Sequence, residues 1–169
     1  MRPELETEFE DFVAAASPRL FRAAYAISRD HHHAEDAVQA ALVKAYVRWR
    51  RIAGTERPEA YVRRMVVNEV LSWRRRASSG ELPTGALPEP AGAEQTALLA
   101  ESDAMWSAIG LLPPRQRAVL VLRYYEQLSE AEIADTLGIR PGTVKSQCAA
   151  ALTNLRRAWD RTTLEGDRV

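Results

Sequence analysis

Residues 128–146 read LSEAEIADTLGIRPGTVKS, and this stretch decides how the fold of the chain is interpreted. Ser129 precedes Glu132 by three residues, which is the spacing of a capping box. In that motif the hydroxyl and the carboxylate each accept a hydrogen bond from a free backbone amide at a helix start. Gly138 favours a left-handed helix end, and Pro141 restarts a helix three residues later. The stretch therefore predicts two helices joined by a short glycine turn, the spacing of a helix-turn-helix.

The second helix of this pair has an outer side without acids. Its buried stripe is expected at Val144, Cys148, Ala151, Leu152, Leu155 and Trp159. Its outer side offers groups that can contact base edges and phosphates, namely Thr143, Lys145, Ser146, Gln147, Asn154, Arg156 and Arg157. No acid occurs from Gly138 to Ala158, whereas a face that is only solvated usually mixes charges. Two interpretations stay open, a DNA-binding helix-turn-helix and a helical hairpin that only packs, and the acid-free side favours the first.

Charge is distributed in blocks along the 169 residues, although 23 basic and 23 acidic residues cancel in total. Residues 1–39 hold 8 acids and 4 bases, and residues 40–77 hold 3 acids and 10 bases. Residues 78–104 hold 5 acids and no base, and residues 105–169 hold 7 acids and 9 bases. A phosphate backbone responds to charge within about 10 Å, so the neutral total does not exclude nucleic acid as a partner.

A linker is indicated at residues 78–94, which contain Pro83, Pro88 and Pro90 and no aromatic residue. We therefore predict an all-α fold of two small helical domains, at 1–77 and 95–160, joined by a flexible linker and followed by a tail at 161–169. Ala, Leu, Arg and Glu dominate the chain, and these residues lose little side-chain freedom in helices. The second domain should begin with a helix through Leu98, Ser102, Met105, Trp106 and Ile109, followed by one opened by Pro113 and Pro114 that runs through Tyr125.

Apolar residues of the first domain recur at helical spacing in three segments. The first holds Phe9, Phe12, Val13 and Ala16, after which Pro18 fits the first turn of a further helix. The second runs from about His33 to Arg51, with Val38, Ala41, Leu42, Ala45, Tyr46 and Trp49 in its stripe and Asp36, Gln39, Lys44 and Arg48 outside. After a break at Gly54 and Thr55, the third runs from Pro58 to Ala77, with Val62, Met65, Val66, Val70 and Trp73 on its inner face.

The outer side of the 58–77 segment is cationic, with Arg63, Arg64, Asn68, Arg74 and Arg75. It is either a solvated basic face or a track for nucleic acid, in which cations hold phosphates and an aromatic ring stacks on an unpaired base. Five arginines between residues 63 and 76 share the segment with one acid, Glu69, which favours the track. Trp73 is expected in the core, so Tyr61 is the better stacking residue.

Metal, cofactor and catalytic sites are not expected. Because His31, His32 and His33 are adjacent, their side chains should diverge by about 100° each and not converge on one ion. We interpret them as the entry turn of a helix. Cys148, the single cysteine, should pack as a small hydrophobe. With no catalytic motif, secretory signal or membrane-length apolar run in the sequence, we expect a cytoplasmic protein that is not an enzyme, needs no cofactor and does not insert into a membrane.

Three stretches resemble the extracytoplasmic-function sigma factors, the smallest sigma class, which keep only the second and fourth sigma regions. Residues 34–46 (AEDAVQAALVKAY) resemble the second-region helix that docks on polymerase. Residues 58–68 (PEAYVRRMVVN), with WRRR at 73–76, resemble the helix that melts and reads the minus-ten element. Residues 112–117 (LPPRQR), 124–125, 128–134 and 142–146 resemble the fourth region. The pair Ser146 and Gln147 resembles an actinobacterial subgroup of the class.

The resemblance implies a promoter-specificity factor that directs promoter recognition, DNA melting and transcription initiation. Its implied partners are core RNA polymerase (clamp helices and flap), promoter DNA and an anti-sigma factor. Polymerase contacts are implied for Asp36, Gln39, Leu42 and Tyr46. Minus-ten contacts are implied for Tyr61, Arg63, Arg64, Asn68, Arg74 and Arg75, and the loop from Ile52 to Arg57 would help Asn68 to hold a flipped base. Minus-thirty-five contacts are implied for Arg140, Thr143, Lys145, Ser146, Gln147, Ala149 and Ala150.

Several positions depart from the family pattern. Ala40 stands where a glutamate is common, Arg140 where a serine caps the helix, and Gln147, Ala149 and Ala150 where arginine or bulky residues are common. A missing bidentate guanidinium costs about 1–3 kcal/mol of discrimination at one base, so we expect a minus-thirty-five preference of its own. A second hypothesis also stays open: a helix-turn-helix regulator or sigma mimic that acts without polymerase.

Overall fold

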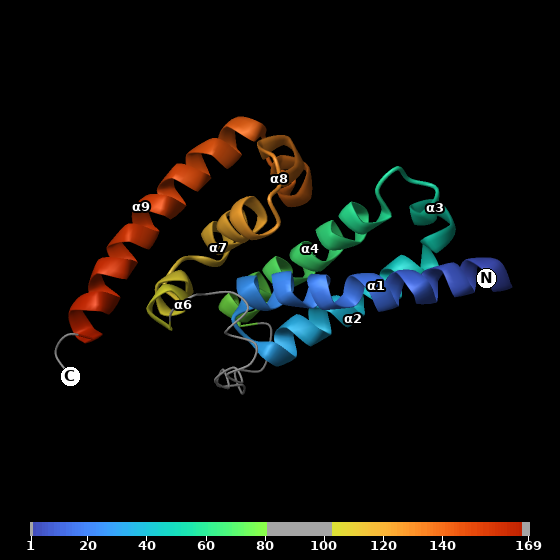
Figure 1. Cartoon of the computed structure of the whole chain (residues 1–169), viewed down its shortest axis with the longest axis horizontal. Helices are drawn as coiled ribbons and strands as arrows, with labels where there is room; N and C mark the ends of the chain where they lie inside the picture. Colours follow the sequence, from blue (N-terminus) through green and yellow to red (C-terminus); the bar gives the residue numbers. More distant parts are fainter. Residues whose placement is uncertain (1, 81–102, 167–169) are drawn as a thin grey trace. The chain divides into compact units, whose positions relative to one another are not determined.

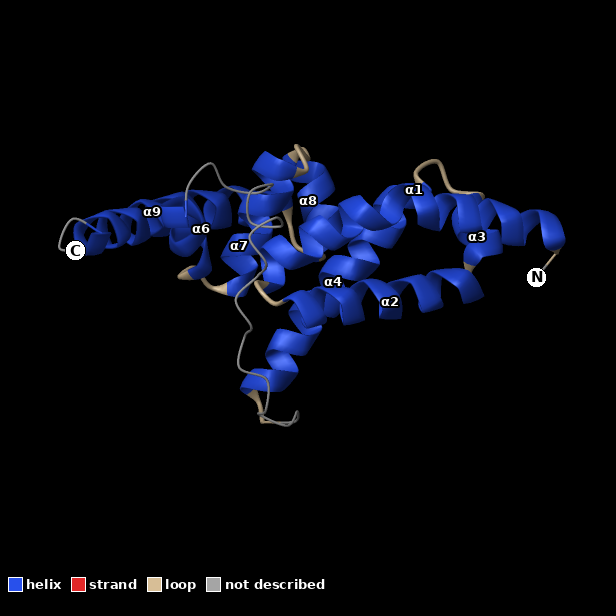
Figure 2. Cartoon of the chain, turned by 60° about the horizontal axis from the view of Figure 1, so that its bottom comes forward, coloured by secondary structure: helices blue, strands red, loops and turns tan. Residues whose placement is uncertain are grey.

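The computed structural model describes residues 2–80 and 103–166, and these contain eight α-helices, one π-helical turn and no strand (Figure 1, Figure 2). The predicted all-α fold is confirmed. The chain separates into two compact units, residues 1–84 and 85–169, which are described one at a time. No helix within the described ranges is both long enough and apolar enough to cross a membrane.

Unit 1 is a bundle of three helices, α1 (Pro3–Ser28), α2 (His31–Val47) and α4 (Pro58–Ser78). Each of them packs against the other two, and the short α3 (Trp49–Ala53) contacts all three (Figure 1). Their shared core includes the fully buried Tyr25, Ile27, Trp49, Ile52, Val62, Val66, Val67 and Val70. Burying one such apolar side chain stabilises the fold by about 1.5–3 kcal/mol, so the apolar stripes seen in the sequence hold the bundle together.

Helix α1 is continuous across Pro18, so the predicted start of a new helix at that proline is wrong. A proline inside a helix costs about 3 kcal/mol, because it removes the hydrogen bond to the carbonyl four residues back. That carbonyl belongs to Ala14, and both residues are exposed, so water can reach it. Beyond the proline, Leu20, Ala24 and Ile27 are buried, and their burial offsets the cost.

Two residues join α1 to α2 and fix where α2 begins. Arg29 has a left-handed φ of 62° and donates its backbone N–H to the Tyr25 carbonyl (2.8 Å). Asp30 then caps α2, because its carboxylate accepts a hydrogen bond from the His33 backbone N–H (2.9 Å). The predicted helix-entry turn at the histidines is confirmed. The expected single segment is instead two helices, since the chain breaks at Arg48 between α2 and α3.

Unit 2 packs three short helices on a long one. Helices α6 (Asp103–Gly110), α7 (Pro114–Leu120) and α8 (Glu130–Leu137) all contact α9 (Pro141–Gly166). The expected helix through Tyr125 is present, but its last turn, η1 (Val121–Tyr125), is a π-helix. Leu112, Leu120 and Ala151 form a buried cluster with the half-buried Cys148 and Leu155, so the cysteine packs as a small hydrophobe. Leu98 and Ser102, expected in the first helix, lie outside the described residues.

The turn between α8 and α9 has the predicted geometry. The Glu132 backbone N–H donates to Ser129 Oγ (3.2 Å), and the Ser129 backbone N–H donates to Glu132 Oε2 (2.9 Å), so the capping box is confirmed. Gly138 ends α8 with a left-handed φ of 66°. Two amides in the first turn of α9 then donate to the Arg140 carbonyl. These contacts fix the residue at which α9 begins, and so they help to determine which of its side chains face outward.

Candidate protein and nucleic-acid interfaces

The exposed side of α2 carries a strip of polar and apolar residues. Asp36 and Gln39 are exposed, and Val43 and Val47 are 63% and 79% exposed. Positions 36, 39, 43 and 47 are three or four residues apart, so they follow one another along one side of the helix. We call this set the α2 strip. Apolar side chains that gather on a polar surface mark a contact with another macromolecule. Neither valine is among the expected contact residues, although the spacing from Gln39 could have placed both on this side.

Two residues expected to contact polymerase have structural roles in the bundle. Leu42 is 7% exposed and lies in the core, so it offers almost no surface to a partner, and we leave it out of the interface. Tyr46 was expected in the buried stripe but is 40% exposed. Its ring packs edge-on against Phe9, and its hydroxyl donates to Glu6 Oε1 (3.5 Å), which ties α2 to the start of α1.

Helix α4 presents one narrow outward face, made of Tyr61, Arg64, Asn68 and Arg75. At about 100° per residue, these four positions fall within an arc of about 60°. Arg64, Asn68 and Arg75 are exposed, and Tyr61 is half-buried. The face therefore combines two permanent cations, an amide that both donates and accepts hydrogen bonds, and an aromatic ring. This combination suits a single strand with an unstacked base better than it suits a regular duplex.

Arg63 and Arg74, which were expected among the minus-ten contacts, lie outside the α4 face. Arg63 is 8% exposed because its position turns toward the bundle. Arg74 is half-buried, and its guanidinium donates a hydrogen bond to the Ser28 carbonyl at the end of α1. Burial lowers the pKa of Arg74, and the nearby Asp30 opposes that effect. Arg74 thus joins α4 to the end of α1.

Only part of the segment from Ile52 to Arg57, which was expected to help hold a base, forms a loop. Residues 52 and 53 belong to α3, and Ile52 is fully buried. The Thr55 hydroxyl donates to the Ile52 carbonyl (2.6 Å), which anchors the turn on the core. Glu56 and Arg57 are exposed. The part of this loop that can meet a partner is therefore residues 54–57.

The three adjacent histidines have different environments. His33 is buried in unit 1, its ring contacts the half-buried Trp73 of α4, and burial lowers its pKa to about 4, so it is neutral at physiological pH. His31 and His32 instead converge with Glu35, because one ligand atom of each of the three lies within 4.8 Å of the others. The three histidines do not converge on one point, as expected, but two of them approach the same carboxylate.

Helix α9, with Arg140 just before it, presents the residues expected at the minus-thirty-five element. Arg140, Lys145, Ser146, Ala149 and Ala150 are exposed, and Thr143 and Gln147 are half-buried. The Ser146 hydroxyl donates to the Thr143 carbonyl (3.0 Å), which leaves its oxygen available to accept a hydrogen bond. All seven residues are thus accessible at least in part, and the two alanines let a partner approach the helix closely.

Two residues of α9 lie elsewhere than expected. Asn154 was expected on the outer side, but it is half-buried and its amide donates to Gln116 Oε1 on α7 (2.9 Å). Leu152 was expected in the buried stripe, but it is 41% exposed. The observed buried stripe continues through Ala151 and Ala158. Leu152 follows Ala151 and is turned about 100° from it, so its side chain faces outward.

Comparisons with known proteins give the identity of both units. The Sigma-70 region 2 model matches residues 12–80, and the Sigma-70 region 4 model matches residues 102–155. An RNA polymerase sigma-E factor of Streptomyces avermitilis is 37% identical over 158 residues, which cover 94% of this chain and 88% of the relative. The ECF RNA polymerase sigma factor SigM of Mycobacterium tuberculosis is 37% identical over 155 residues, covering 88% of this chain and 76% of the relative.

Solved structures share the fold. The sigma factor RpoE of Bartonella quintana, in complex with the anti-sigma factor NepR, has a TM-score of 0.71 at 22% identity and covers 90% of this chain and 97% of its own. CnrH, in complex with the cytosolic domain of CnrY, has a TM-score of 0.62 at 21% identity and covers 92% of this chain and 90% of its own. From the matched regions and the actinobacterial relatives, the chain belongs to the sigma-70 family of RNA polymerase sigma factors, in its extracytoplasmic-function class.

Proposed function

We propose that this chain binds core RNA polymerase and directs promoter recognition, DNA melting and transcription initiation as an extracytoplasmic-function sigma factor. The observation that carries the proposal is the α4 face, where Tyr61, Arg64, Asn68 and Arg75 share one surface. A merely solvated helix side gains nothing from an aromatic ring and an amide between two cations. An extruded base, by contrast, requires a ring to stack on and a partner for its exposed edge.

The α4 face acts on the minus-ten element. Asn68, with residues 54–57, holds a non-template base that has left the duplex, and Tyr61 supplies the stacking surface. Arg64 and Arg75 bind phosphates of the same strand. Unstacking a base costs a few kcal/mol, so protein contacts made only by the extruded base shift the equilibrium toward the open strand.

The α2 strip docks on the clamp helices of the polymerase. Asp36 and Gln39 supply hydrogen bonds, and Val43 and Val47 supply apolar area. Removing a valine side chain from water contributes up to about 1.5 kcal/mol, so the two valines add a substantial part of a docking energy. Tyr46 lies at the edge of this surface and keeps α2 fixed to α1.

The outward side of α9 enters the major groove of the minus-thirty-five element. Arg140 and Thr143 clasp the backbone at the start of the helix, and Lys145 and Ser146 reach base edges or phosphates. Gln147, Ala149 and Ala150 complete the surface, and the alanines can contact thymine methyl groups.

A second polymerase contact is proposed on unit 2. A pocket of about 500 Å³ lies between the turn after α6 and the C-terminal half of α9, and Leu111, Leu112, Pro113, Arg157 and Ala158 help to line it. Leu111 is exposed, and Arg157 and Arg161 line the same pocket. An apolar contact beside positive charge suits an amphipathic segment with acidic flanks, and we assign the pocket to the polymerase flap.

The chain is proposed to act by binding and not by catalysis, in the cytoplasm beside the polymerase. An anti-sigma factor is proposed as a third partner. The α2 strip exposes Val43 and Val47 in the free protein, and a regulatory partner that covers them would block polymerase docking.

The test is run-off transcription with purified core polymerase on promoters mapped from transcription starts after overexpression. Specific transcripts that require both proteins are expected. Asn68→Ala should impair promoter opening and leave polymerase binding intact, because Asn68 belongs to the α4 face and not to the α2 strip. Lys145→Ala should weaken upstream-element binding and lower its dependence on salt. Failure to bind core polymerase would refute the proposal. Identical behaviour of the two variants would refute the division between α4 and α9.

A helix-turn-helix regulator that works without polymerase is the alternative outcome of the same test. Its signature is duplex binding by the full chain that is as tight without polymerase as with it. The α4 face would then have no role, so Asn68→Ala would leave that binding unchanged.

A further inference from the structure

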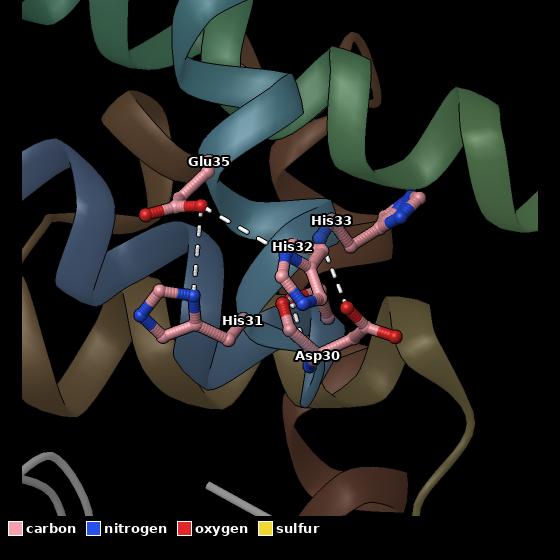
Figure 3. Close-up of polar contacts among 6 residues, drawn as sticks. Asp30, His31, His32, His33 and Glu35 are labelled. Carbon is pink, nitrogen blue, oxygen red and sulfur yellow. Dashed lines mark hydrogen bonds and ion pairs between the residues drawn. The ribbon is translucent and has the colours of Figure 1, made fainter. Parts of the chain in front are cut away.

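The start of α2 brings together side chains that the proposed function does not use. Nδ1 of His31 lies 3.6 Å from Glu35 Oε2, and Nδ1 of His32 lies 4.0 Å from the same oxygen. One ligand atom from each of the three residues lies within 4.8 Å of the other two. Figure 3 shows both rings turned toward the carboxylate, while His33 points the other way.

The spacing of these atoms is close to that of a metal site. Around a tetrahedral zinc ion with bonds of about 2.0–2.2 Å, neighbouring ligand atoms are about 3.3–3.6 Å apart. The distance between His31 and Glu35 already matches that value. The His32 side chain is 75% exposed, so a small rotation can bring its nitrogen into range without disturbing the core.

His31 and the helix start are held in place before any ion binds. The His31 ring packs edge-on against Phe21 and Tyr25 of α1, with ring centroids 5.1 Å and 6.5 Å apart. The Asp30 cap fixes the first turn of α2 through the His33 amide. A ligand whose rotamer is already fixed loses less conformational entropy on binding, so this arrangement favours capture of an ion.

We propose that His31, His32 and Glu35 bind one divalent transition-metal ion, with water in the remaining coordination positions. Two imidazole nitrogens and one carboxylate oxygen suit zinc, nickel or copper, whereas magnesium and calcium prefer oxygen ligands. The amide dipoles at a helix N-terminus disfavour a cation, and the negative charge of Glu35 opposes that effect within the site. The site shares no residue with the α2 strip, the α4 face or the outward side of α9.

The experiment titrates zinc into the full-length protein, made without a polyhistidine tag, stripped with EDTA and dialysed, by isothermal titration calorimetry. We expect one ion per chain. His31→Ala, His32→Ala and Glu35→Gln should each weaken binding by at least about tenfold. Asp36→Asn is the matched control, since it removes the next exposed carboxylate along α2, and Cys148→Ser removes the thiol. Both controls should bind as the wild type does.

Thermal unfolding gives a second readout, since an ion that binds only the folded state raises the melting temperature. Zinc should raise it for the wild type and Asp36→Asn but not for Glu35→Gln, with circular dichroism confirming that each variant is folded. No stoichiometric binding, or binding unchanged in Glu35→Gln, would overturn the site. If Asp36→Asn lost as much zinc affinity as Glu35→Gln, surface charge alone would collect the ion, and the site would be overturned. Equal affinity for magnesium would also overturn it, because the imidazoles would then contribute nothing.

Discussion

Arg63 and Arg64 are neighbours in the sequence with opposite exposure, so their alanine variants should fail in different ways. Arg63 is 8% exposed, and Arg64 is exposed on the same face as Asn68. One step along a helix turns the side chain by about 100°, which here separates the bundle side of α4 from its outward face. The pair therefore offers two variants with the same change in charge and different surroundings.

The expected magnitudes follow from that difference. Arg64→Ala should leave the free energy of unfolding within about 0.5 kcal/mol of the wild type, as for most surface substitutions. It should lower the slope of log affinity against log salt by about 0.7, the contribution of one phosphate contact to a single strand. Arg63→Ala removes a buried side chain and its packing in the bundle, so it should destabilise unit 1 by about 2–3 kcal/mol and leave the salt slope unchanged.

Two assays separate these outcomes. Urea unfolding followed by circular dichroism gives the free energy of unfolding. Fluorescence anisotropy of a labelled minus-ten strand, bound by the factor with core polymerase over a series of salt concentrations, gives the slope. Arg64→Lys is the control, because it keeps the charge and should keep the slope. Suppose instead that Arg63→Ala were as stable as the wild type and its slope of log affinity against log salt fell by about 0.7. The assignment of DNA contacts by side-chain burial would then be refuted.

Three further predictions concern α2, α8 and the core of unit 1. Val47→Asp places a charge on the α2 strip, so affinity for core polymerase in a competition assay should fall at least about tenfold, with no loss of stability because the site is 79% exposed. Ser129→Ala removes the hydroxyl that accepts from the Glu132 amide, so urea unfolding of unit 2 should show a loss of about 1 kcal/mol, which Ser129→Asp should largely restore. The pKa of His33 is lowered to about 4 in the folded chain, so the unfolded chain takes up the proton first. The stability of unit 1 should therefore be complete above about pH 6.5 and fall by up to about 3 kcal/mol as the pH drops toward 4, and His33→Gln should flatten that fall in urea unfolding with EDTA present.

The helix pair α8–α9 was predictable because its determinants are local. The capping box and the left-handed glycine each depend on residues only a few positions apart. Both can therefore be recognised from the sequence, and both are present in the structure. Helix α1 shows the opposite case. Pro18 carries a strong local signal for a helix start, and the burial of Leu20 and Ile27 beyond it overrides that signal.

Side-chain placement was less predictable than helix placement. Periodicity assigns α4 an inner and an outer side, and an arginine is expected outside, so Arg63 was misplaced although its neighbour was not. At His31 and His32 the backbone directions diverge as expected. The rings extend far enough from the backbone that their nitrogens meet a carboxylate one turn later, which sequence spacing alone does not reveal.

The charge on α9 gives a physical reason for unit 2 to depend on polymerase. Residues 138–158 hold four bases, Arg140, Lys145, Arg156 and Arg157, and no acid. If all four met phosphates of duplex DNA, the salt slope would be about 3.6, below that of proteins that make 6–10 such contacts. Unit 2 alone should therefore hold duplex DNA weakly at physiological salt. Once polymerase holds unit 1 at a promoter, the second contact becomes intramolecular, with an effective concentration on the order of millimolar. The modest basicity of α9 should therefore keep unit 2 from occupying duplex DNA by itself, and its binding at one promoter element should depend on engagement of the other by unit 1.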